Sequence, residues 1–169
     1  MGQNDITKIL KVYFESGDKS FTVRDLSALT KIPRSTVQNR LKELKNQKLV
    51  NEKNMVEGDL FRTKKIHYYI ESSVVVGLID FLVKELNPSC IILFGSFRKG
   101  GSVKESDFDI FVESSIKKEI NLARFEKMLG HSIDLFVESN ISNLQKNLFN
   151  NIINGIKLYG NLYVGGRDE

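Results

Sequence analysis

The chain of 169 residues contains one cysteine, two prolines, no tryptophan and no long uncharged apolar run. A single cysteine, Cys90, excludes an internal disulfide and indicates a reducing compartment. Asp80 interrupts the most apolar stretch, residues 74–83, and no basic segment followed by an apolar core opens the chain. These absences argue against a membrane span and a secretory signal, so we expect a cytoplasmic protein without a membrane partner.

Composition and charge favour a folded protein with a basic first part. Hydrophobic residues make up 41% of the chain and charged residues 27%, which argues against extensive disorder. The net charge of +4 is unevenly spread, because residues 1–70 contain 14 Lys and Arg against 8 Asp and Glu, and the rest contain 11 against 13. The first part is therefore suited to a polyanion such as nucleic acid, or it presents a solvated basic face without a partner.

Apolar residues recur at helical spacing in the first fifty positions and predict helices over residues 6–16, 22–30 and 33–47. Thr22 is placed to cap the second helix, and Pro33 fits the first turn of the third. The outward face of the third helix carries residue types that hydrogen-bond bases and phosphates: Arg34, Ser35, Thr36, Gln38, Asn39 and Lys42.

A basic hairpin is predicted after these helices. Leu49 and Val50 begin a strand, residues 55–59 make a turn, and residues 60–70 return as a second strand with Arg62, Lys64 and Lys65. Three helices followed by such a hairpin resemble the winged helix-turn-helix fold over residues 6–70. The resemblance implies that the third helix enters the major groove of DNA and that the hairpin touches the backbone or minor groove. A winged helix used for protein contact or dimerisation is the alternative.

Residues 71–86 predict an apolar helix that is buried on more than one side and bridges two domains. Asn87 and Pro88 end it, because the residue before proline disfavours helix. Its apolar breadth would also supply a dimer contact. Winged-helix readers of DNA are often two-fold symmetric, so we expect a homodimer.

The stretch 94–112 looks dictated by chemistry more than by packing. A short apolar run, residues 89–94, predicts a buried strand that ends at Gly95-Ser96. Glycine permits the backbone to approach a ligand closely, and amide donors at the start of a following helix favour phosphate oxygens. Arg98 and Lys99 add positive charge, and Gly100-Gly101 permits a turn towards a second strand.

Two aspartates follow at a spacing of two residues. On a strand, Asp107 and Asp109 point to the same face, and carboxylates that close repel each other unless a cation lies between them. Hard oxygen ligands of this type select Mg²⁺ or Mn²⁺. Residues 132–137 predict another strand with one aspartate, Asp134, set among apolar residues. Sharing the same cation would offset the cost of burying that carboxylate.

These residues resemble the minimal nucleotidyltransferases of the DNA polymerase β-like superfamily. The match comprises Gly95, Ser96, Gly100, Ser106, Asp107, Asp109 and Asp134. The chain departs from the family at Phe97-Arg98-Lys99, where the usual loop has arginine, a small residue and arginine. Lys99 keeps the charge of the second arginine but loses its bidentate fork.

The resemblance implies a catalytic site. Asp107, Asp109 and Asp134 would hold two Mg²⁺ ions, and the nucleotide would be bound by Gly95, Ser96, Arg98, Lys99 and Ser106. The substrate would be a nucleoside triphosphate, for which ATP is expected, and a nucleoside monophosphate would pass to a hydroxyl. Relatives include antitoxins that adenylylate a HEPN-type toxin and enzymes that modify aminoglycosides, and a macromolecular acceptor fits this short chain better. The alternative is a DNA-binding transcription regulator whose second domain senses nucleotide or dimerises without turnover.

The expected fold class is α/β (α+β). Residues 1–70 form a winged helix-turn-helix domain, residues 71–88 a connecting helix, and residues 89–169 a nucleotidyltransferase domain with a small mixed sheet flanked by helices. Within the last domain, residues 116–129 and 144–156 predict helices. His131 is expected on the face opposite Asp134 and is not counted as catalytic.

Overall fold

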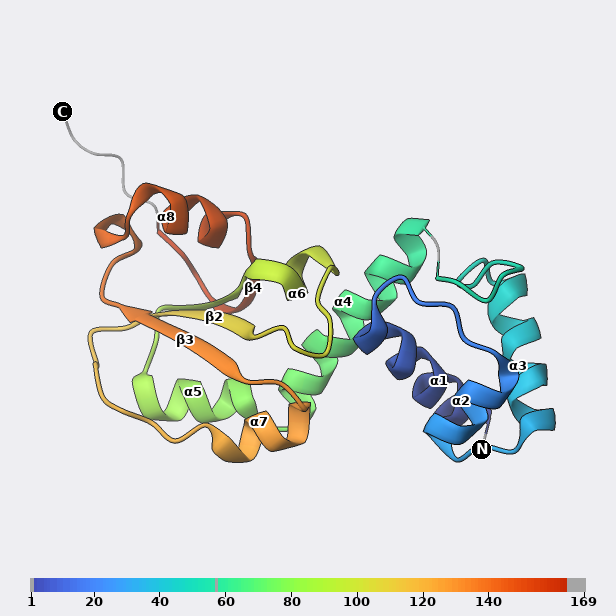
Figure 1. The fold of residues 1–169 in the computed structure, drawn as a ribbon. Helices are drawn as coiled ribbons and strands as arrows, with labels where there is room; N and C mark the ends of the chain where they lie inside the picture. Colours follow the sequence, from blue (N-terminus) through green and yellow to red (C-terminus); the bar gives the residue numbers. More distant parts are fainter. Residues whose placement is uncertain (1, 57, 164–169) are drawn as a thin grey trace. The chain divides into compact units, whose positions relative to one another are not determined.

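The computed structural model describes residues 2–56 and 58–163; residues 164–169, which the sequence analysis assigns to the nucleotidyltransferase domain, lie outside the described residues. The described chain forms two compact units. The first contains the residues up to Lys65 together with Gly101–Lys104, and the second contains Ile66–Gly100 and the residues from Glu105 onward. The elements, in chain order, are α1 (Gly2–Ser16), α2 (Val23–Thr30), α3 (Arg34–Asn46), α4 (Gly58–Val75), α5 (Leu78–Leu86), β1 (Cys90–Leu93), α6 (Gly95–Lys99), β2 (Phe108–Glu113), α7 (Ala123–Leu129), β3 (Ile133–Glu138), the 3-10 helix η1 (Ile141–Asn143), α8 (Lys146–Ile153) and β4 (Ile156–Gly160) (Figure 1).

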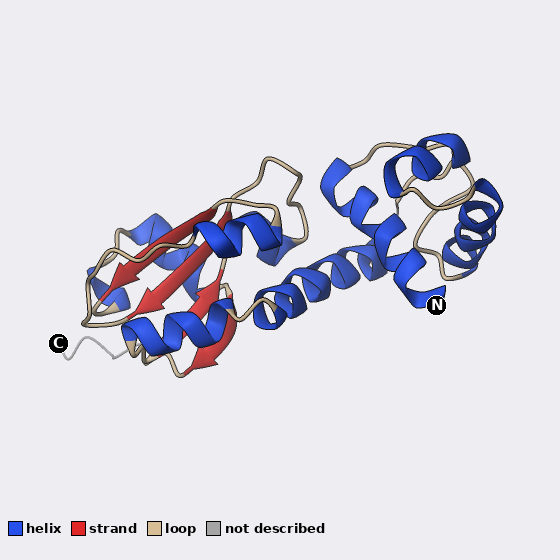
Figure 2. Cartoon of the chain, turned by 90° about the horizontal axis from the view of Figure 1, so that it is seen from below, coloured by secondary structure: helices blue, strands red, loops and turns tan. Residues whose placement is uncertain are grey.

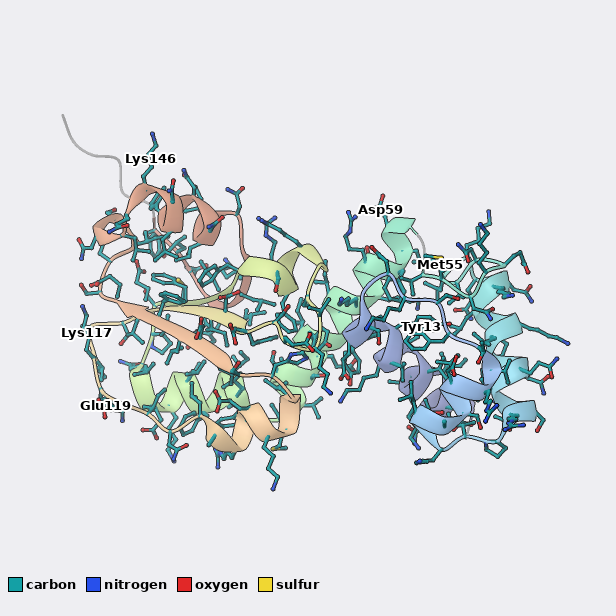
Figure 3. The ribbon with its side chains drawn as sticks, viewed as in Figure 1. Tyr13, Met55, Asp59, Lys117, Glu119 and Lys146 are labelled. Atoms are coloured by element: carbon teal, nitrogen blue, oxygen red, sulfur yellow. The ribbon has the colours of Figure 1, made fainter. Side chains whose placement is uncertain are left out.

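The three predicted N-terminal helices are present as α1, α2 and α3. Thr22 caps α2, because its hydroxyl accepts a hydrogen bond from the Asp25 backbone N–H while the Asp25 carboxylate accepts one from Thr22. Tyr13 lies inside the helical unit, where its hydroxyl donates to the Asn54 carbonyl over 3.1 Å (Figure 3). Burial raises the pKa of Tyr13 to about 12.

The predicted hairpin is wrong in its second strand. Residues 60–70 lie inside the helix α4, and a single antiparallel bridge between Val50 and Val56 is what the described residues keep of the hairpin. Arg62 and Lys64 therefore sit exposed on a helix, and Arg62 pairs with Asp59 at 3.3 Å.

The reason for this error lies in the buried stripe of α4. Phe61, Lys65, Tyr69 and Ser73 are all buried and recur every four residues, which is helical spacing. Because Lys65 and Ser73 are polar, the apolar pattern of the sequence does not reveal this helical spacing. Lys65 donates a hydrogen bond to the Ser102 carbonyl, and burial lowers its pKa to about 8. The prediction that Lys65 is a surface cation for DNA is therefore wrong.

The apolar helix predicted over residues 71–86 is also divided. α4 ends at Val75 and α5 begins at Leu78, because Gly77 adopts a left-handed conformation at φ 77°. Val74 and Val75 lie in the stretch predicted to be buried on more than one side, but they are 55% and 77% exposed. No described helix is by itself long and apolar enough to cross a membrane; α4 and α5 meet such a test only as a pair, which is bent by 56° at its break.

The second unit is built on a mixed sheet of four strands in the order β3-β2-β1-β4. β1 pairs antiparallel with β2 and with β4, whereas β2 and β3 run parallel. α5 and α7 cover one face of the sheet and α8 covers the other (Figures 1 and 2). The expected small mixed sheet flanked by helices is therefore confirmed.

Two helical predictions in this unit were too long. The helix expected over residues 116–129 is reduced to α7, and Ile116 is 40% exposed. The helix expected over residues 144–156 ends at Ile153, and Ile156–Gly160 forms the strand β4 instead.

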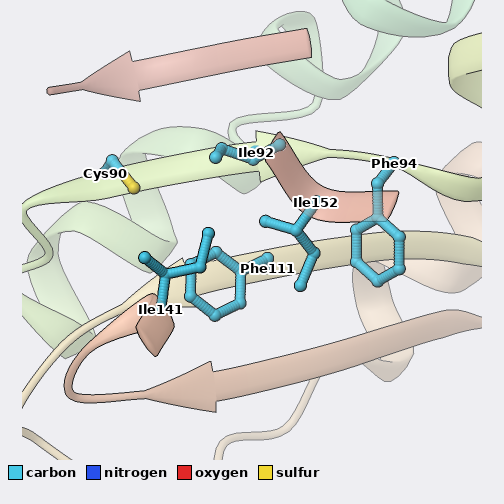
Figure 4. Close-up of a cluster of buried hydrophobic side chains, with 6 residues drawn as sticks. All are labelled: Cys90, Ile92, Phe94, Phe111, Ile141 and Ile152. Carbon is cyan, nitrogen blue, oxygen red and sulfur yellow. The ribbon is translucent and has the colours of Figure 1, made fainter. Parts of the chain in front are cut away.

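The core beneath α8 is apolar and continuous across the sheet. Its buried members are Cys90, Ile92, Phe94, Phe111, Ile141 and Ile152 (Figure 4). Phe94 and Phe136 make an edge contact at 5.5 Å between ring centroids. Burial raises the pKa of the Cys90 thiol to about 11, so this cysteine is a packed apolar group. Alternate residues of β1 and β2 face this core, and the apolar residues between them are buried on the other face of the sheet.

Candidate active site

The parallel pairing of β2 and β3 brings two of the predicted aspartates together. Asp109 lies opposite Asp134, and two residues further on Phe111 lies opposite Phe136. Phe111 and Phe136 belong to the core beneath α8, so strand alternation places both aspartates on that same face of the sheet. Asp134 is exposed and Asp109 is half-buried, at one end of this core.

Asp107 is held differently, because it precedes the first residue of β2. Its side chain is exposed, and its Oδ1 accepts a hydrogen bond from the Ser132 hydroxyl. Ser132 stands two residues before Asp134, so the contact continues the same pairing of the two strands.

Gly95 brings the backbone against Asp109. It has φ 68°, a conformation that side chains disfavour, and a Cβ at this position would lie 2.7 Å from Cγ of Asp109 and still closer to Oδ2. The neighbouring Phe94 N–H donates to the Asp109 carbonyl over 3.1 Å. Only glycine therefore fits at the start of α6 beside the carboxylate.

The charge state of Asp109 reflects this crowding. Burial, followed by the negative charges of Asp134 and Asp107, raises the pKa of the Asp109 carboxyl above its ordinary value of 3.8. A hydrogen bond from the Ser96 backbone N–H acts in the opposite direction but does not cancel the rise. Two carboxyl groups on neighbouring strands and a third just before β2 thus interact around a backbone that approaches closely, a combination typical of functional sites.

A family model described as "Polymerase beta, Nucleotidyltransferase" matches residues 77–162, half of the chain. The match runs from Gly77 in front of α5 to the residues just after β4, and it includes Gly95 and the three aspartates. The chain belongs to this family. Nucleotidyl transfer is the reaction class that the family suggests, in agreement with the resemblance found in the sequence. No curated protein and no solved structure matches the chain.

The residues of this nucleotidyltransferase domain fit a divalent cation by their chemistry. Nucleoside triphosphates and divalent metals are typical of the family, and three carboxylates supply the hard oxygen atoms that Mg²⁺ and Mn²⁺ prefer. Burial, together with the charges of Asp134 and Asp107, raises the pKa of Asp109, which is the setting in which a cation would offset the repulsion. Within residues 2–56 and 58–163, however, no group of three His, Cys, Asp or Glu side chains is already gathered tightly enough to hold a metal ion.

The other residues predicted to bind nucleotide lie nearby in the chain. Arg98 and Lys99 are in the last turn of α6, where Lys99 is exposed and Arg98 is half-buried. Arg98 Nε is buried without a hydrogen-bond partner in the described part of the chain. Ser106 is half-buried, and its carbonyl lies 3.0 Å from Nδ1 of His131.

Sequence reasoning missed Ser132 and the environment of His131. Ser132 contacts Asp107, and His131 lies buried against Phe97 and Tyr69. A signal for Ser132 was present, because residues 107–113 and 132–138 share one pattern, a polar residue followed two positions later by Asp and four positions later by Phe-Val-Glu. Aligning the two segments predicts the observed register.

Proposed function

We propose that the chain transfers a nucleoside monophosphate, with ATP as the expected donor, to a hydroxyl of a macromolecular acceptor, using Mg²⁺ or Mn²⁺. The observation that carries the proposal is the approach of the Gly95 backbone to the Asp109 carboxylate, which in turn pairs across the sheet with Asp134. A backbone this close to an acidic cluster places amide donors for phosphates beside the groups that would hold a cation.

The side chains of Asp107, Asp109 and Asp134 would hold the cation, and Gly95 and Ser96 would bind phosphate oxygens. Arg98 and Lys99 would add positive charge on the same short helix. The chemistry that a bound cation supplies here is neutralisation of the triphosphate and a lower pKa for the attacking hydroxyl. The acceptor oxygen bonds to the α-phosphorus as the bond to pyrophosphate breaks, so positioning is the main task of the protein.

The exposure of the site favours a large acceptor. The side chains of Asp107 and Asp134 are open to solvent, so the attacking hydroxyl need not fit inside a closed pocket. A partner protein would satisfy this requirement, and a HEPN-type toxin is one such acceptor among relatives of this type.

The test uses ATP labelled at the α-phosphorus or at the γ-phosphorus, incubated with the full chain, Mg²⁺ and an extract of its host cells. We expect the α-label to become attached to a macromolecule and the γ-label to be released in pyrophosphate. Asp107→Ala combined with Asp109→Ala should abolish the attachment. Attachment that survives this double substitution, or attachment of the γ-label, would contradict the proposal.

A second function, DNA binding, is favoured by the surface of α3. Val37, Leu41 and Leu44 form its buried stripe. The opposite surface exposes basic and amide side chains, namely Arg34, Ser35, Gln38, Asn39 and Lys42, with Thr36 half-buried. α2 and α3 are joined by a short turn in which Lys31 has φ 61°, a connection that supports a helix-turn-helix although residues 60–70 form a helix in place of the predicted second strand. We propose that α3 contacts duplex DNA.

Replacing Arg34 and Lys42 together by alanine should weaken binding of the full chain to duplex DNA. The slope of the logarithm of the binding constant against the logarithm of salt concentration should become shallower by about 2, since each lost phosphate contact contributes about 1. Fluorescence anisotropy at several salt concentrations measures both effects.

The matched control for this experiment is Lys84→Ala with Lys127→Ala, which removes the same charge from two exposed residues of the second unit. We expect the control to leave the salt slope unchanged. Equal weakening by the two double variants would show that net charge, and not the face of α3, determines binding.

A further inference from the structure

Two adjacent residues in front of β3 contact three consecutive residues around Asp107. His131 Nδ1 lies 3.0 Å from the Ser106 carbonyl, and the Ser132 hydroxyl donates to Oδ1 of Asp107. The Phe108 backbone N–H donates to the Ser132 carbonyl over 2.8 Å. The dipeptide His131-Ser132 therefore fixes the chain before Asp107, the carboxylate of Asp107 and the chain after it.

The imidazole of His131 is itself fixed in one orientation. The residue is 5% exposed, and the rings of Phe97 and Tyr69 meet it edge-on at 4.9 and 5.3 Å between centroids. A carbonyl oxygen only accepts hydrogen bonds, so Nδ1 carries the proton that bonds to Ser106. In the neutral ring Nε2 is then the acceptor, and it lies 3.3 Å from the Tyr69 hydroxyl.

Asp107 needs such support more than the other two aspartates. Asp109 and Asp134 lie within β2 and β3, where backbone pairing fixes their direction. Asp107 lies outside β2 and its side chain is exposed, so the strand pairing does not define its rotamer. The Ser132 hydroxyl contacts Oδ1 of this carboxylate, and His131 holds the carbonyl of the preceding residue, Ser106. These two contacts direct the carboxylate.

We propose that His131 and Ser132 are positioning residues that direct the Asp107 carboxylate for the reaction, with Tyr69 setting the tautomer of His131. None of the three would touch the nucleotide. The inference rests on the proposed function, because it assigns a task to Asp107 that only nucleotidyl transfer requires. Groups that orient a metal-binding carboxylate typically change metal affinity or activity by about 10- to 100-fold when removed.

The test pairs each disruptive substitution with a conservative one. Ser132→Ala removes the hydroxyl and Ser132→Thr keeps it; His131→Leu removes the donor to Ser106, and His131→Asn keeps an N–H near the position of Nδ1. Tyr69→Phe removes only the hydroxyl that faces Nε2. Ser115→Ala, at an exposed serine after β2, is the control.

Two measurements distinguish positioning from mere folding. In the full chain, Ser132→Ala and His131→Leu should raise the Mn²⁺ concentration for half-maximal transfer by about 10- to 100-fold, with the KM of the acceptor unchanged and with Ser132→Thr and His131→Asn recovering most of the loss. Tyr69→Phe should cause a smaller loss of the same kind. In the metal-free protein, NMR relaxation should show the backbone amides of Asp107 and Phe108 becoming more mobile in Ser132→Ala and His131→Leu alone.

The outcomes are separable. Unchanged Mn²⁺ dependence and unchanged amide relaxation in both disruptive variants would overturn the inference. Losses that follow the melting temperature and are not rescued by the conservative variants would overturn it as well. If the wild-type chain transfers no nucleotide, the proposed function fails, and the relaxation of Asp107 in the metal-free protein still decides whether His131 and Ser132 hold it.

Discussion

Gly95→Ala should lower the rate of nucleotidyl transfer by at least about a hundredfold and weaken nucleotide binding. The added Cβ would lie 2.7 Å from Cγ of Asp109 and would occupy a conformation, φ 68°, that alanine disfavours. The start of α6 and the Asp109 carboxylate must therefore move apart. Displacements of about 1 Å in an active site commonly cost a hundredfold in rate. Steady-state kinetics and calorimetric titration with an ATP analogue measure the two losses.

The control is Gly101→Ala, six residues further along. A Cβ at Gly101 meets no atom within 4 Å, so this substitution should leave rate and binding close to those of the wild type. Wild-type activity in Gly95→Ala would contradict the assignment of this backbone to the site. Loss of activity in both variants would instead indicate that the segment tolerates no added bulk.

Asp109→Asn should lower the transfer rate without lowering the stability of the fold. Removing one carboxylate that would hold the cation should lower the transfer rate by about a thousandfold, since such charge stabilisation amounts to several kcal/mol and each 1.4 kcal/mol is tenfold. In metal-free buffer the same variant should be at least as stable as the wild type. Burial and the charges of Asp134 and Asp107 oppose ionisation of Asp109 in the folded protein, and asparagine relieves that opposition.

The sign of the pH dependence follows from the raised pKa of Asp109. The folded protein binds this proton more tightly than the unfolded chain, so ionisation costs stability at any pH above the folded pKa. The advantage of Asp109→Asn in melting temperature should be largest near neutral pH. It should shrink as the pH falls through the folded pKa towards 3.8, the ordinary value.

Glu119→Gln is the control for Asp109→Asn, because Glu119 is an exposed carboxylate in the loop before α7 (Figure 3). It should change neither the transfer rate nor the pH dependence of melting. A variant Asp109→Asn that is clearly less stable than the wild type in metal-free buffer would show that the carboxylate serves the fold instead of the reaction.

The strands that carry the aspartates could be predicted because chemistry and packing leave the same pattern. Asp109 and Asp134 each stand before three apolar residues and a glutamate, and these residues pair position by position in the parallel ladder. Gly95 was predicted to permit close approach, but the atom it approaches, the Asp109 carboxylate, follows only from the pairing of β1 with β2. A turn depends on neighbouring residues, whereas a contact between paired strands depends on residues that are far apart in the sequence.

The errors arose where polar residues are buried or where tertiary pairing overrides local pattern. Lys65 lies inside the buried stripe of α4 and interrupts its apolar spacing. The aromatic and β-branched residues around it are typical of a strand and led to that prediction. Ile156 continues the apolar spacing of α8, but residues 156–160 pair with β1 as β4, because the edge of β1 needs backbone partners. Gly77 breaks an apolar run that composition alone cannot divide.

The most direct test of the catalytic site is a crystal structure of the full chain with a nonhydrolysable ATP analogue and Mn²⁺, located by its anomalous scattering. We expect Mn²⁺ within bonding distance of Asp107, Asp109 and Asp134, and phosphate oxygens bound at Gly95 and Ser96. Analogue and metal bound together elsewhere, with these five residues unengaged, would contradict the assignment of this site to nucleotidyl transfer.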